Sequence, residues 1–292
     1  MILIGEHINI MSTTIGPAMR ERNPGPIQEM AKAEVEAGVD YLDINIGPAR
    51  KGGDEMMAWV VNTVQGVTDL PLSLDTTNSV AMEAGLKVCK SKALINSISL
   101  QPARLEQGLP LAKNYNADMI GLLWGVEGMP RDANERAILA VDMVYKANEM
   151  GIPSEMIWID PIASPVCVEI NQVKACVEFM SMLGDIAPGC KSTVGLSNIS
   201  NGTPANLRPL LNRTYLIMLM RYGLYSAIVD AFDPELTKIA RGEMPEIVDL
   251  VHRVMDGDKP DLSSLSHKEA EYVKTVRVLI GESLYSDSWL EI

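Results

Sequence analysis

Thr193-Val-Gly-Leu-Ser-Asn198-Ile-Ser200 is a short apolar run that ends in amide and hydroxyl side chains. Four other runs end in Asp or Asn in the same way: Leu42-Asp-Ile-Asn45, Leu72-Ser-Leu-Asp75, Leu94-Ile-Asn96 and Ile157-Trp-Ile-Asp160. Apolar runs of this length are typical of buried strands. The repeated polar ending predicts that several strands carry a polar side chain to the same rim of a barrel.

Strands and helices alternate along the chain. The eight predicted strands cover 2–6, 41–45, 72–75, 93–96, 118–123, 156–160, 192–196 and 227–230. A segment with helical spacing of apolar residues follows each strand, and such alternation indicates a parallel sheet. Eight units within 292 residues predict a closed (β/α)8 TIM barrel. A doubly wound open sheet is the alternative, but no GxGxxG turn follows the first strand.

The segment after the eighth unit departs from this rhythm. Residues 237–266 are predicted to be a helical insertion, and residues 267–292 a closing helix and tail. No internal repeat or low-complexity stretch marks a second domain. We therefore expect residues 1–292 to form a single domain.

Composition and charge exclude several classes of function. The chain has 25 Lys and Arg against 38 Asp and Glu, so its net charge is −13, which argues against a nucleic-acid partner. No signal peptide or membrane-spanning run is visible, so a cytoplasmic protein without a membrane partner is expected. The four cysteines form no CxxC pair and the three histidines are scattered, so no protein-built metal site is expected.

The carboxyl ends of barrel strands meet at one face, where active sites form. The polar residues expected around this mouth are Glu6, Asn9, Asp43, Asn45, Asp75, Asn96, Asp160 and Asn198. They are carboxylates and carboxamides with little positive charge, and Asp230 and Asp233 would repel a phosphate. The set suits a neutral heterocycle rich in N–H donors, such as a pterin, because carboxylates accept such bonds at roughly 1.5–3 kcal/mol each.

Each residue also has a purely structural interpretation. Asp43 and Asp75 can cap the helices that follow their strands, which is the commoner role for a lone Asp at such a position. Asn45 and Asn96 can stabilise tight turns. Glu6 can belong to a structural ion pair. Only the recurrence of acids and amides at one rim favours a binding site over these roles.

The motifs around these residues resemble those of a known family. Five of them occur in order at the spacing of barrel units: Leu-Asp43-Ile-Asn45-Ile-Gly-Pro, Leu-Asp75-Thr-Thr-Asn78, Ala-Leu-Ile-Asn96-Ser, Trp-Ile-Asp160-Pro and Gly-Leu-Ser-Asn198-Ile-Ser. Two more match as well, Ile-Gly-Glu6-His-Ile-Asn9 and Arg208-Pro-Leu-Leu-Asn212-Arg213-Thr. Together they resemble the methyltetrahydrofolate:corrinoid protein methyltransferases of the pterin-binding TIM-barrel superfamily. The resemblance covers the chain except for about 237–266.

The resemblance implies a folate bound with its pterin ring in the barrel mouth. It implies that Asp75, Asn96 and Asp160 hold the ring and that Asn198, as the catalytic residue, approaches N5. Further folate contacts are expected from Gly195, Ser197, Arg208, Glu6, Asp43 and Asn45. Arg208 can instead pair with an acid near the start of a helix. The loop Asn201-Gly-Thr-Pro204 departs from the family pattern, which has a longer amide there.

The activity implied is methyl transfer between N5 of tetrahydrofolate and the cobalt of a corrinoid. The Asp-x-His-x-x-Gly corrinoid-binding signature is absent from the sequence, so the corrinoid is expected on a separate partner protein. The insertion favours transfer from a methylcorrinoid to tetrahydrofolate in a demethylase system. The alternative direction runs from 5-methyltetrahydrofolate to a corrinoid iron–sulfur protein in acetyl-CoA synthesis. The resemblance also implies a homodimer.

Two other functions compete with this interpretation. Dihydropteroate synthase shares the barrel and the pterin pocket, but it needs basic residues for a diphosphate and an Arg-x-His near the last strand. Ala227-Ile-Val-Asp230-Ala-Phe-Asp233 has neither. The second competitor is a non-catalytic folate-binding protein that uses the insertion as an interaction surface.

Overall fold

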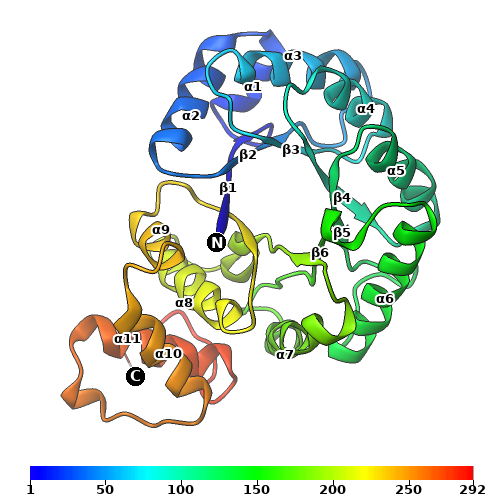
Figure 1. Cartoon of the computed structure of the whole chain (residues 1–292). Helices are drawn as coiled ribbons and strands as arrows, with labels where there is room; N and C mark the ends of the chain where they lie inside the picture. The colour runs from blue at the N-terminus through cyan, green and yellow to red at the C-terminus, as the bar shows by residue number, and fades with distance from the viewer. Residues whose placement is uncertain (292) are drawn as a thin grey trace.

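The computed structural model describes residues 1–291 and places eight parallel strands inside a ring of helices (Figure 1). The strands are β1 (Ile2–Asn9), β2 (Tyr41–Asn45), β3 (Leu72–Asp75), β4 (Leu94–Ser99), β5 (Asp118–Leu122), β6 (Ile157–Asp160), β7 (Lys191–Ser192) and β8 (Ser226–Val229). Their order in the sheet is β7-β6-β5-β4-β3-β2-β1-β8. Because β1 pairs in parallel with both β2 and β8, the sheet curls into a barrel and is not doubly wound.

The barrel closes between β7 and β8 through few contacts. Ile228 N donates to Val194 O at 2.9 Å, and Gly195 forms an isolated parallel bridge with Ile228. The predicted strand over 192–196 was wrong in extent, because β7 ends at Ser192 and Leu196–Ser200 forms a 3-10 turn. The apolar residues of this stretch are buried nonetheless. The chain therefore turns early and presents the end of the stretch at the barrel rim.

Helices surround the strands. Those of the first seven units are α1 (Ile15–Glu21), α2 (Pro24–Glu36), α3 (Gly53–Gln65), α4 (Ser79–Val88), α5 (Pro102–Asn114), α6 (Ala133–Glu149), α7 (Ile170–Ile186) and α8 (Arg208–Met220). The expected start of α2 is confirmed, since Asn23 caps it by accepting from Gly25 N and Pro24 occupies the first position. In the part of the chain described, no helix is long and apolar enough to cross a bilayer.

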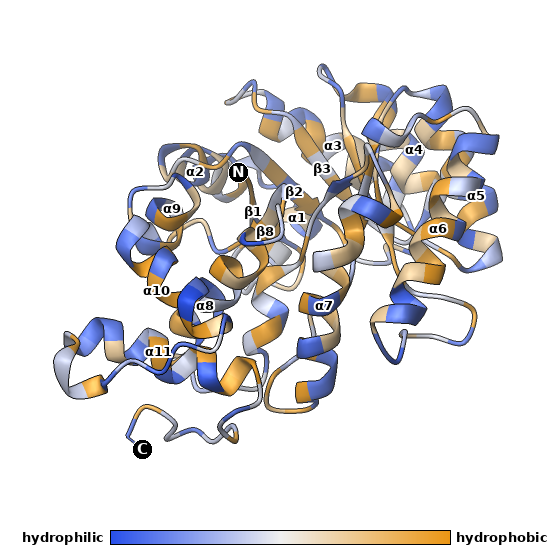
Figure 2. Cartoon of the chain, turned by 60° about the horizontal axis from the view of Figure 1, so that its bottom comes forward, coloured by the Kyte–Doolittle hydropathy of each residue, from blue (hydrophilic) through white to orange (hydrophobic). Residues whose placement is uncertain are grey.

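Three helices follow the eighth strand: α9 (Pro234–Ala240), α10 (Pro245–Met255) and α11 (His267–Leu279). α9 packs against β1 and α8 and takes the place of the eighth barrel helix. α10 and α11 pack against α8 from outside, and Figures 1 and 2 show this pair beyond the ring. Because α8 is covered on both sides, it is buried almost all round, from Leu211 to Leu219 with the exception of Arg213.

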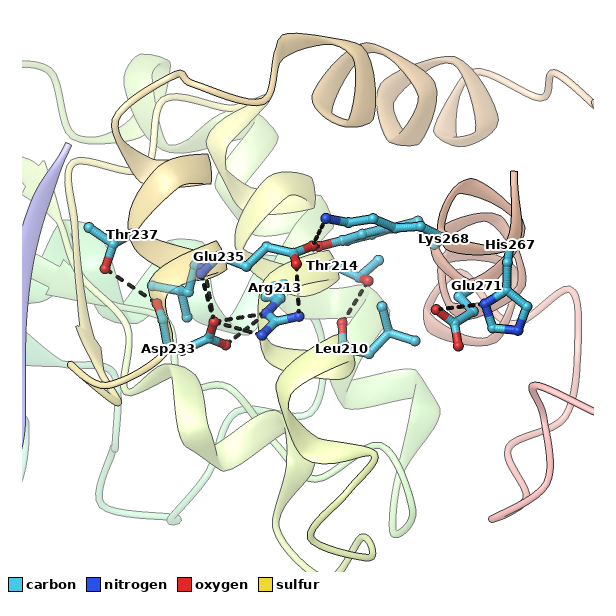
Figure 3. Close-up of polar contacts among 11 residues, drawn as sticks. Leu210, Arg213, Thr214, Asp233, Glu235, Thr237, His267, Lys268 and Glu271 are labelled. Atoms are coloured by element: carbon cyan, nitrogen blue, oxygen red, sulfur yellow. Dashed lines mark hydrogen bonds and ion pairs between the residues drawn. The ribbon is translucent and has the colours of Figure 1, made fainter. Parts of the chain in front are cut away.

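A cluster of charged side chains joins α8, α9 and α11 (Figure 3). Arg213 of α8 lies 2.7 Å from Asp233 and 3.3 Å from Glu235, and Lys268 of α11 lies 2.8 Å from Glu235. Asp233 also caps α9 by accepting from Glu235 N and Leu236 N. Its charge is thus compensated within the fold, and it does not stand free at the barrel mouth.

The register of the sheet places the strand ends level with one another. Asn9 pairs with Asn45, Asn45 with Asp75, and Asp75 with Asn96. Four polar side chains therefore form one continuous row across β1 to β4, at the carboxyl ends of the strands. Asp43 lies one layer deeper, because inward-facing residues alternate along a strand.

Candidate functional site

The upper layer of the site is joined by an amide–carboxylate contact. Asn45 Nδ2 donates to Asp75 Oδ2, while Asn45 Oδ1 accepts from Gly47 N at 2.9 Å. Asn45 therefore stabilises the turn after β2 and also orients the Asp75 carboxylate. Asn9 is used locally, since its Oδ1 accepts from Met11 N at 2.9 Å.

Asp43 forms the deeper layer. Its Oδ1 accepts from Ser73 Oγ at 2.6 Å and from Asn96 Nδ2 at 3.0 Å, and the residue is only 4% exposed. Burial raises the pKa of Asp43 to about 6, although both hydrogen bonds act to lower it. Asn96 is thus fixed from below by Asp43, with its carboxamide oxygen left for other partners.

The interpretation of Asp43 and Asp75 as helix caps is wrong. α3 begins after Gly52, whose backbone is left-handed. α4 is capped by Asn78, whose side chain accepts from Val80 N and Ala81 N. Neither aspartate caps the helix that follows it. Both carboxylates instead accept hydrogen bonds from side chains of the neighbouring strands at the barrel mouth.

Arg104 brings a positive charge to this side of the mouth, where sequence analysis expected little. It lies in the first turn of α5 and donates to Thr77 O and Ser97 O, both at 2.6 Å. Burial and the Asp43 carboxylate raise the pKa of Asp75 well above its ordinary range, and the Arg104 charge opposes this. The sequence pattern selects polar residues at the ends of strands. Arg104 lies in a helix, so that pattern could not identify it.

Asp160 lies at the end of β6 and is 9% exposed. Its Oδ1 accepts from Ile162 N at 2.8 Å, in a turn where Ile162 adopts a left-handed φ of 66°. Burial raises the pKa of Asp160 to about 6, while this bond and the Arg136 charge lower it. Among the residues that the structure describes, none donates a hydrogen bond to the second carboxylate oxygen, so it can accept one from a ligand.

Glu6 of β1 and Ser197 of the turn after β7 meet across the closure of the barrel. Ser197 Oγ donates to Glu6 Oε1 at 2.6 Å, so Glu6 is not held in an ion pair as its structural interpretation required. Burial raises the pKa of Glu6, although the Ser197 bond lowers it. Next to it, His7 lies 3.2 Å from the buried Glu34 and 3.3 Å from Asp230.

Asn198 stands in the 3-10 turn after β7 with its side chain exposed. Its Oδ1 accepts from Asn201 Nδ2 at 3.2 Å, which leaves Asn198 Nδ2 free to donate. A Cβ at Gly195 would lie 3.1 Å from that nitrogen, so glycine leaves room for the amide. No ion pair joins Arg208 to an acid within residues 1–291; Arg208 donates to Ser200 Oγ at 3.1 Å, Ser197 O at 3.4 Å and Asn201 Oδ1 at 3.3 Å.

The mouth therefore combines two chemistries. One side holds buried carboxyl groups with raised pKa values, which lose their protons readily once N–H donors approach them. The other side, around Asn198, offers an amide donor that does not titrate. Within residues 1–291 no group of three or more His, Cys, Asp or Glu side chains is arranged to hold a metal ion.

Comparison with known proteins identifies the family. The family model described as "Pterin binding enzyme" matches residues 15–230, which is most of the chain. The chain belongs to the pterin binding enzymes. All the candidate site residues except Glu6 and Asn9 lie inside the matched range.

This pterin binding enzyme is also similar to individual proteins. It is 28% identical over 232 residues to a methylcorrinoid:tetrahydrofolate methyltransferase of Eubacterium limosum, covering 79% of this chain and 85% of that one. It is 24% identical to methionine synthase of Mycobacterium leprae over 97% of this chain, but spans only 25% of that protein. Dihydropteroate synthase of Thermus thermophilus shares the fold, with a TM-score of 0.63, 20% identity, and coverage of 84% and 93%.

Proposed function

We propose that this pterin binding enzyme is a methyltransferase that moves a methyl group between N5 of tetrahydrofolate and the cobalt of a corrinoid on a separate protein. The observation that carries the proposal is the pairing of a carboxylate–amide row with a free amide donor in one barrel mouth. The activity named for the Eubacterium limosum relative supports it. The corrinoid, when present, supplies or accepts the methyl group at cobalt.

The carboxylate side would hold the pterin ring. Asp160, with one oxygen unused by the protein, and Asp75 accept from the amino group and ring N–H groups. Asn96, oriented by Asp43, offers its carboxamide oxygen to a further N–H. Glu6, Ser197, Asn45 and Gly195 shape the same pocket, and Arg208 holds the loop beside it.

Asn198 would act at N5. When the methyl group leaves N5, the bonding electron pair stays on nitrogen, and a hydrogen-bond donor stabilises the developing negative charge until a proton from solvent takes the place of the methyl group. In the reverse direction the neutral N5 would attack the methyl carbon with its lone pair while the carbon–cobalt bond breaks with its electrons left on cobalt, and N5 would then release its proton to solvent. Asn201 holds the Asn198 oxygen, so the amide nitrogen is the atom presented. An amide suits both directions because it stays neutral throughout.

The surface around the mouth fits a protein partner. Exposed apolar side chains stand on the loops after β1, β5, β6 and β8: Met11 at 85%, Val126 at 71%, Val168 at 77% and Phe232 at 47% exposure. Apolar residues gathered around a functional opening are typical of interaction sites. We assign this rim to the corrinoid-binding protein, which has to bring its cobalt to N5.

For direction, we favour transfer from methylcorrinoid to tetrahydrofolate in a demethylase system. The support is the α10–α11 pair, which extends the barrel beyond a compact form, and the name of the 28% identical relative, which puts methylcorrinoid before tetrahydrofolate. The reverse reaction, toward a corrinoid iron–sulfur protein, uses the same residues.

A stopped-flow assay tests the function. Purified protein is mixed with tetrahydrofolate and a methylated corrinoid protein, and loss of the methylcobalt absorbance is followed with formation of 5-methyltetrahydrofolate. Transfer supports the proposal. Folate binding without transfer in either direction favours a non-catalytic binding protein, and formation of dihydropteroate from a pterin diphosphate would identify a synthase instead.

We also propose that the enzyme is a homodimer paired through the outer face of α6. Exposed residues recur there as Asn134, Ile138, Val141, Tyr145 and Asn148, polar at both ends and apolar in the middle. The sequence of polar and apolar positions along this face is nearly the same from either end of α6. Two antiparallel copies of the helix related by a two-fold axis would therefore place apolar residues against apolar residues and polar against polar. Light scattering of Val141→Glu tests it: a monomer is expected, and an unchanged dimer would exclude this face.

A further inference from the structure

The segment after α11 is anchored on α11 and contacts the loop after β7. Trp289 is 4% exposed, and its indole Nε1 donates to Thr275 Oγ1 of α11 at 3.0 Å. The Tyr285 ring lies 5.6 Å from the Trp289 ring, centroid to centroid. Tyr285 is therefore held in place by a buried neighbour although it lies close to the end of the chain.

Tyr285 contacts the loop that follows Asn198. Its hydroxyl lies 3.0 Å from Thr203 Oγ1 and 2.7 Å from Asp287 Oδ1. Thr203 is 8% exposed, and its backbone N donates to Ser200 O at 3.1 Å. The contact thus joins the C-terminal segment to the 3-10 turn that carries Asn198.

The turn between Asn201 and Thr203 is held from two further sides. Cys167, on the loop after β6, donates from Sγ to Asn201 O at 3.1 Å, and Arg208 donates to Asn201 Oδ1 at 3.3 Å. Gly202 adopts a φ of 82°, and a Cβ there would lie 3.0 Å from Cys167 Sγ. Three separate parts of the chain therefore fix this turn, and Tyr285 is the contribution of the C-terminal segment.

Asn201 passes this restraint to Asn198. Its Nδ2 donates to Asn198 Oδ1 at 3.2 Å, so displacement of the turn rotates the amide that faces the mouth. We propose that Tyr285 is a positioning residue for methyl transfer, which acts through Thr203 and Asn201 to orient the Asn198 amide. The inference rests on the proposed function, and it gives the segment beyond the barrel a part in that function.

The expected consequence is a loss of rate with little loss of binding. A donor to N5 has to be held within a few tenths of an ångström, because small misplacements lower the rate of the chemical step steeply. The pterin ring is held by other residues, on β3, β4 and β6. Loosening the turn therefore lowers the single-turnover rate and leaves the dissociation constant for folate close to its original value.

The experiment compares Tyr285→Phe and Thr203→Val with two controls. Thr203→Ser keeps the hydroxyl, and Tyr115→Phe removes a hydroxyl that bonds Glu83 on the far side of the barrel. The first two variants are expected to lower the single-turnover rate about three- to tenfold, the effect of one lost hydrogen bond, while the controls change it less than about twofold. In the Asn198→Ala background, Tyr285→Phe is expected to have no further effect.

A second readout needs no activity. The side-chain ¹⁵NH₂ signal of Asn198, assigned by its loss in Asn198→Ala, is expected to shift in Tyr285→Phe and Thr203→Val but not in the controls. Unchanged rate and unchanged signal in Tyr285→Phe would overturn the inference, as would an equal loss of rate in the Asn198→Ala background. If the wild-type protein transfers no methyl group while the signal still shifts, the proposed function fails and the positioning of Asn198 stands.

Discussion

Asn96 Nδ2 donates to Asp43 Oδ1 at 3.0 Å, and this bond joins the upper and the deeper layer of polar side chains at the site. Asp43 is 4% exposed, and its Oδ1 accepts from both Ser73 and Asn96. We propose that Asp43 acts on the ligand by orienting Asn96. The sequence suggests a folate contact at Asp43, and the structure adds that Asp43 supports Asn96.

Replacing Asp43 by Ala tests this relationship. The Asn96 amide loses the acceptor that orients it, so folate affinity is expected to fall about tenfold, equivalent to roughly 1.4 kcal/mol. Titration calorimetry with tetrahydrofolate measures the change, and the surface variant Asp258→Ala serves as control. An affinity equal to that of the control would show that Asn96 is placed without Asp43.

Asp160→Asn is expected to raise the stability of the fold and to lower its affinity for folate. The carboxylate is buried with a pKa of about 6, so keeping it charged at neutral pH costs the fold on the order of 1–3 kcal/mol, which the amide avoids. The variant should be more stable in urea at pH 7, and the gain should shrink at pH 5, where Asp160 is protonated in the native state. Folate affinity should fall about 10- to 100-fold, since the charge-assisted bonds are lost. A variant that is less stable at pH 7 would contradict the expectation.

The raised pKa values also predict opposite pH dependences for binding and stability. Asp43 and Asp160, both near 6 in the folded chain against an ordinary 3.8, retain protons between about pH 4 and 6 that the unfolded chain has released. Raising the pH through this window therefore lowers the free energy of unfolding contributed by these groups. Folate affinity should rise over the same window, because only the ionised carboxylates accept fully. Urea titrations and binding isotherms at pH 4.5 to 7.5 measure both, and a parallel rise would refute the assignment.

Much of the fold was predictable because the strand ends repeat one chemical pattern. Asn45, Asp75 and Asn96 come from separate strands, yet the sheet register sets them side by side, as parallel strands in a barrel require. The same logic located Asp160. The β7 prediction was wrong because Val194 and Leu196 are buried in a turn as deeply as they would be in a strand, so the hydrophobic pattern cannot distinguish the two.

Other features of the site leave no local trace in the sequence. Arg104 reaches the mouth from a helix, and Tyr285 reaches the Asn198 loop from 82 residues beyond Thr203. Glu34 is a fully buried acid whose place in α2 looks like an ordinary surface position. Such contacts depend on how whole elements pack, and periodicity within one element does not encode that.

Gly5 illustrates this dependence and leads to a stability prediction. A Cβ at residue 5 would lie 2.3 Å from Glu34 Oε1, the oxygen that also accepts from His7 N at 3.1 Å. Gly5→Ala should force the buried carboxylate away from His7 and lower the free energy of unfolding by about 1–3 kcal/mol. Gly184→Ala, in α7 with open space around it, is the matched control and should raise stability by about 0.5–1 kcal/mol. Equal effects in urea denaturation would show that the Glu34 contact adjusts freely.

Asn198→Ala is the central test of the proposed chemistry. The Asn198 amide nitrogen donates to no acceptor in the described part of the chain, so its proposed partner is N5, where it would act as charge develops. Removing it should raise the barrier by about 2–4 kcal/mol, a loss of roughly 30- to 1,000-fold in single-turnover rate. The dissociation constant for tetrahydrofolate should change only a few-fold, because Asp75, Asn96 and Asp160, the residues proposed to hold the ring, are unchanged. Asn206→Ala, at an exposed position of the following loop, is the control for loop mutation. If rate and affinity fall by the same factor in Asn198→Ala, the amide stabilises bound folate and the transition state equally and has no special part in the transfer step.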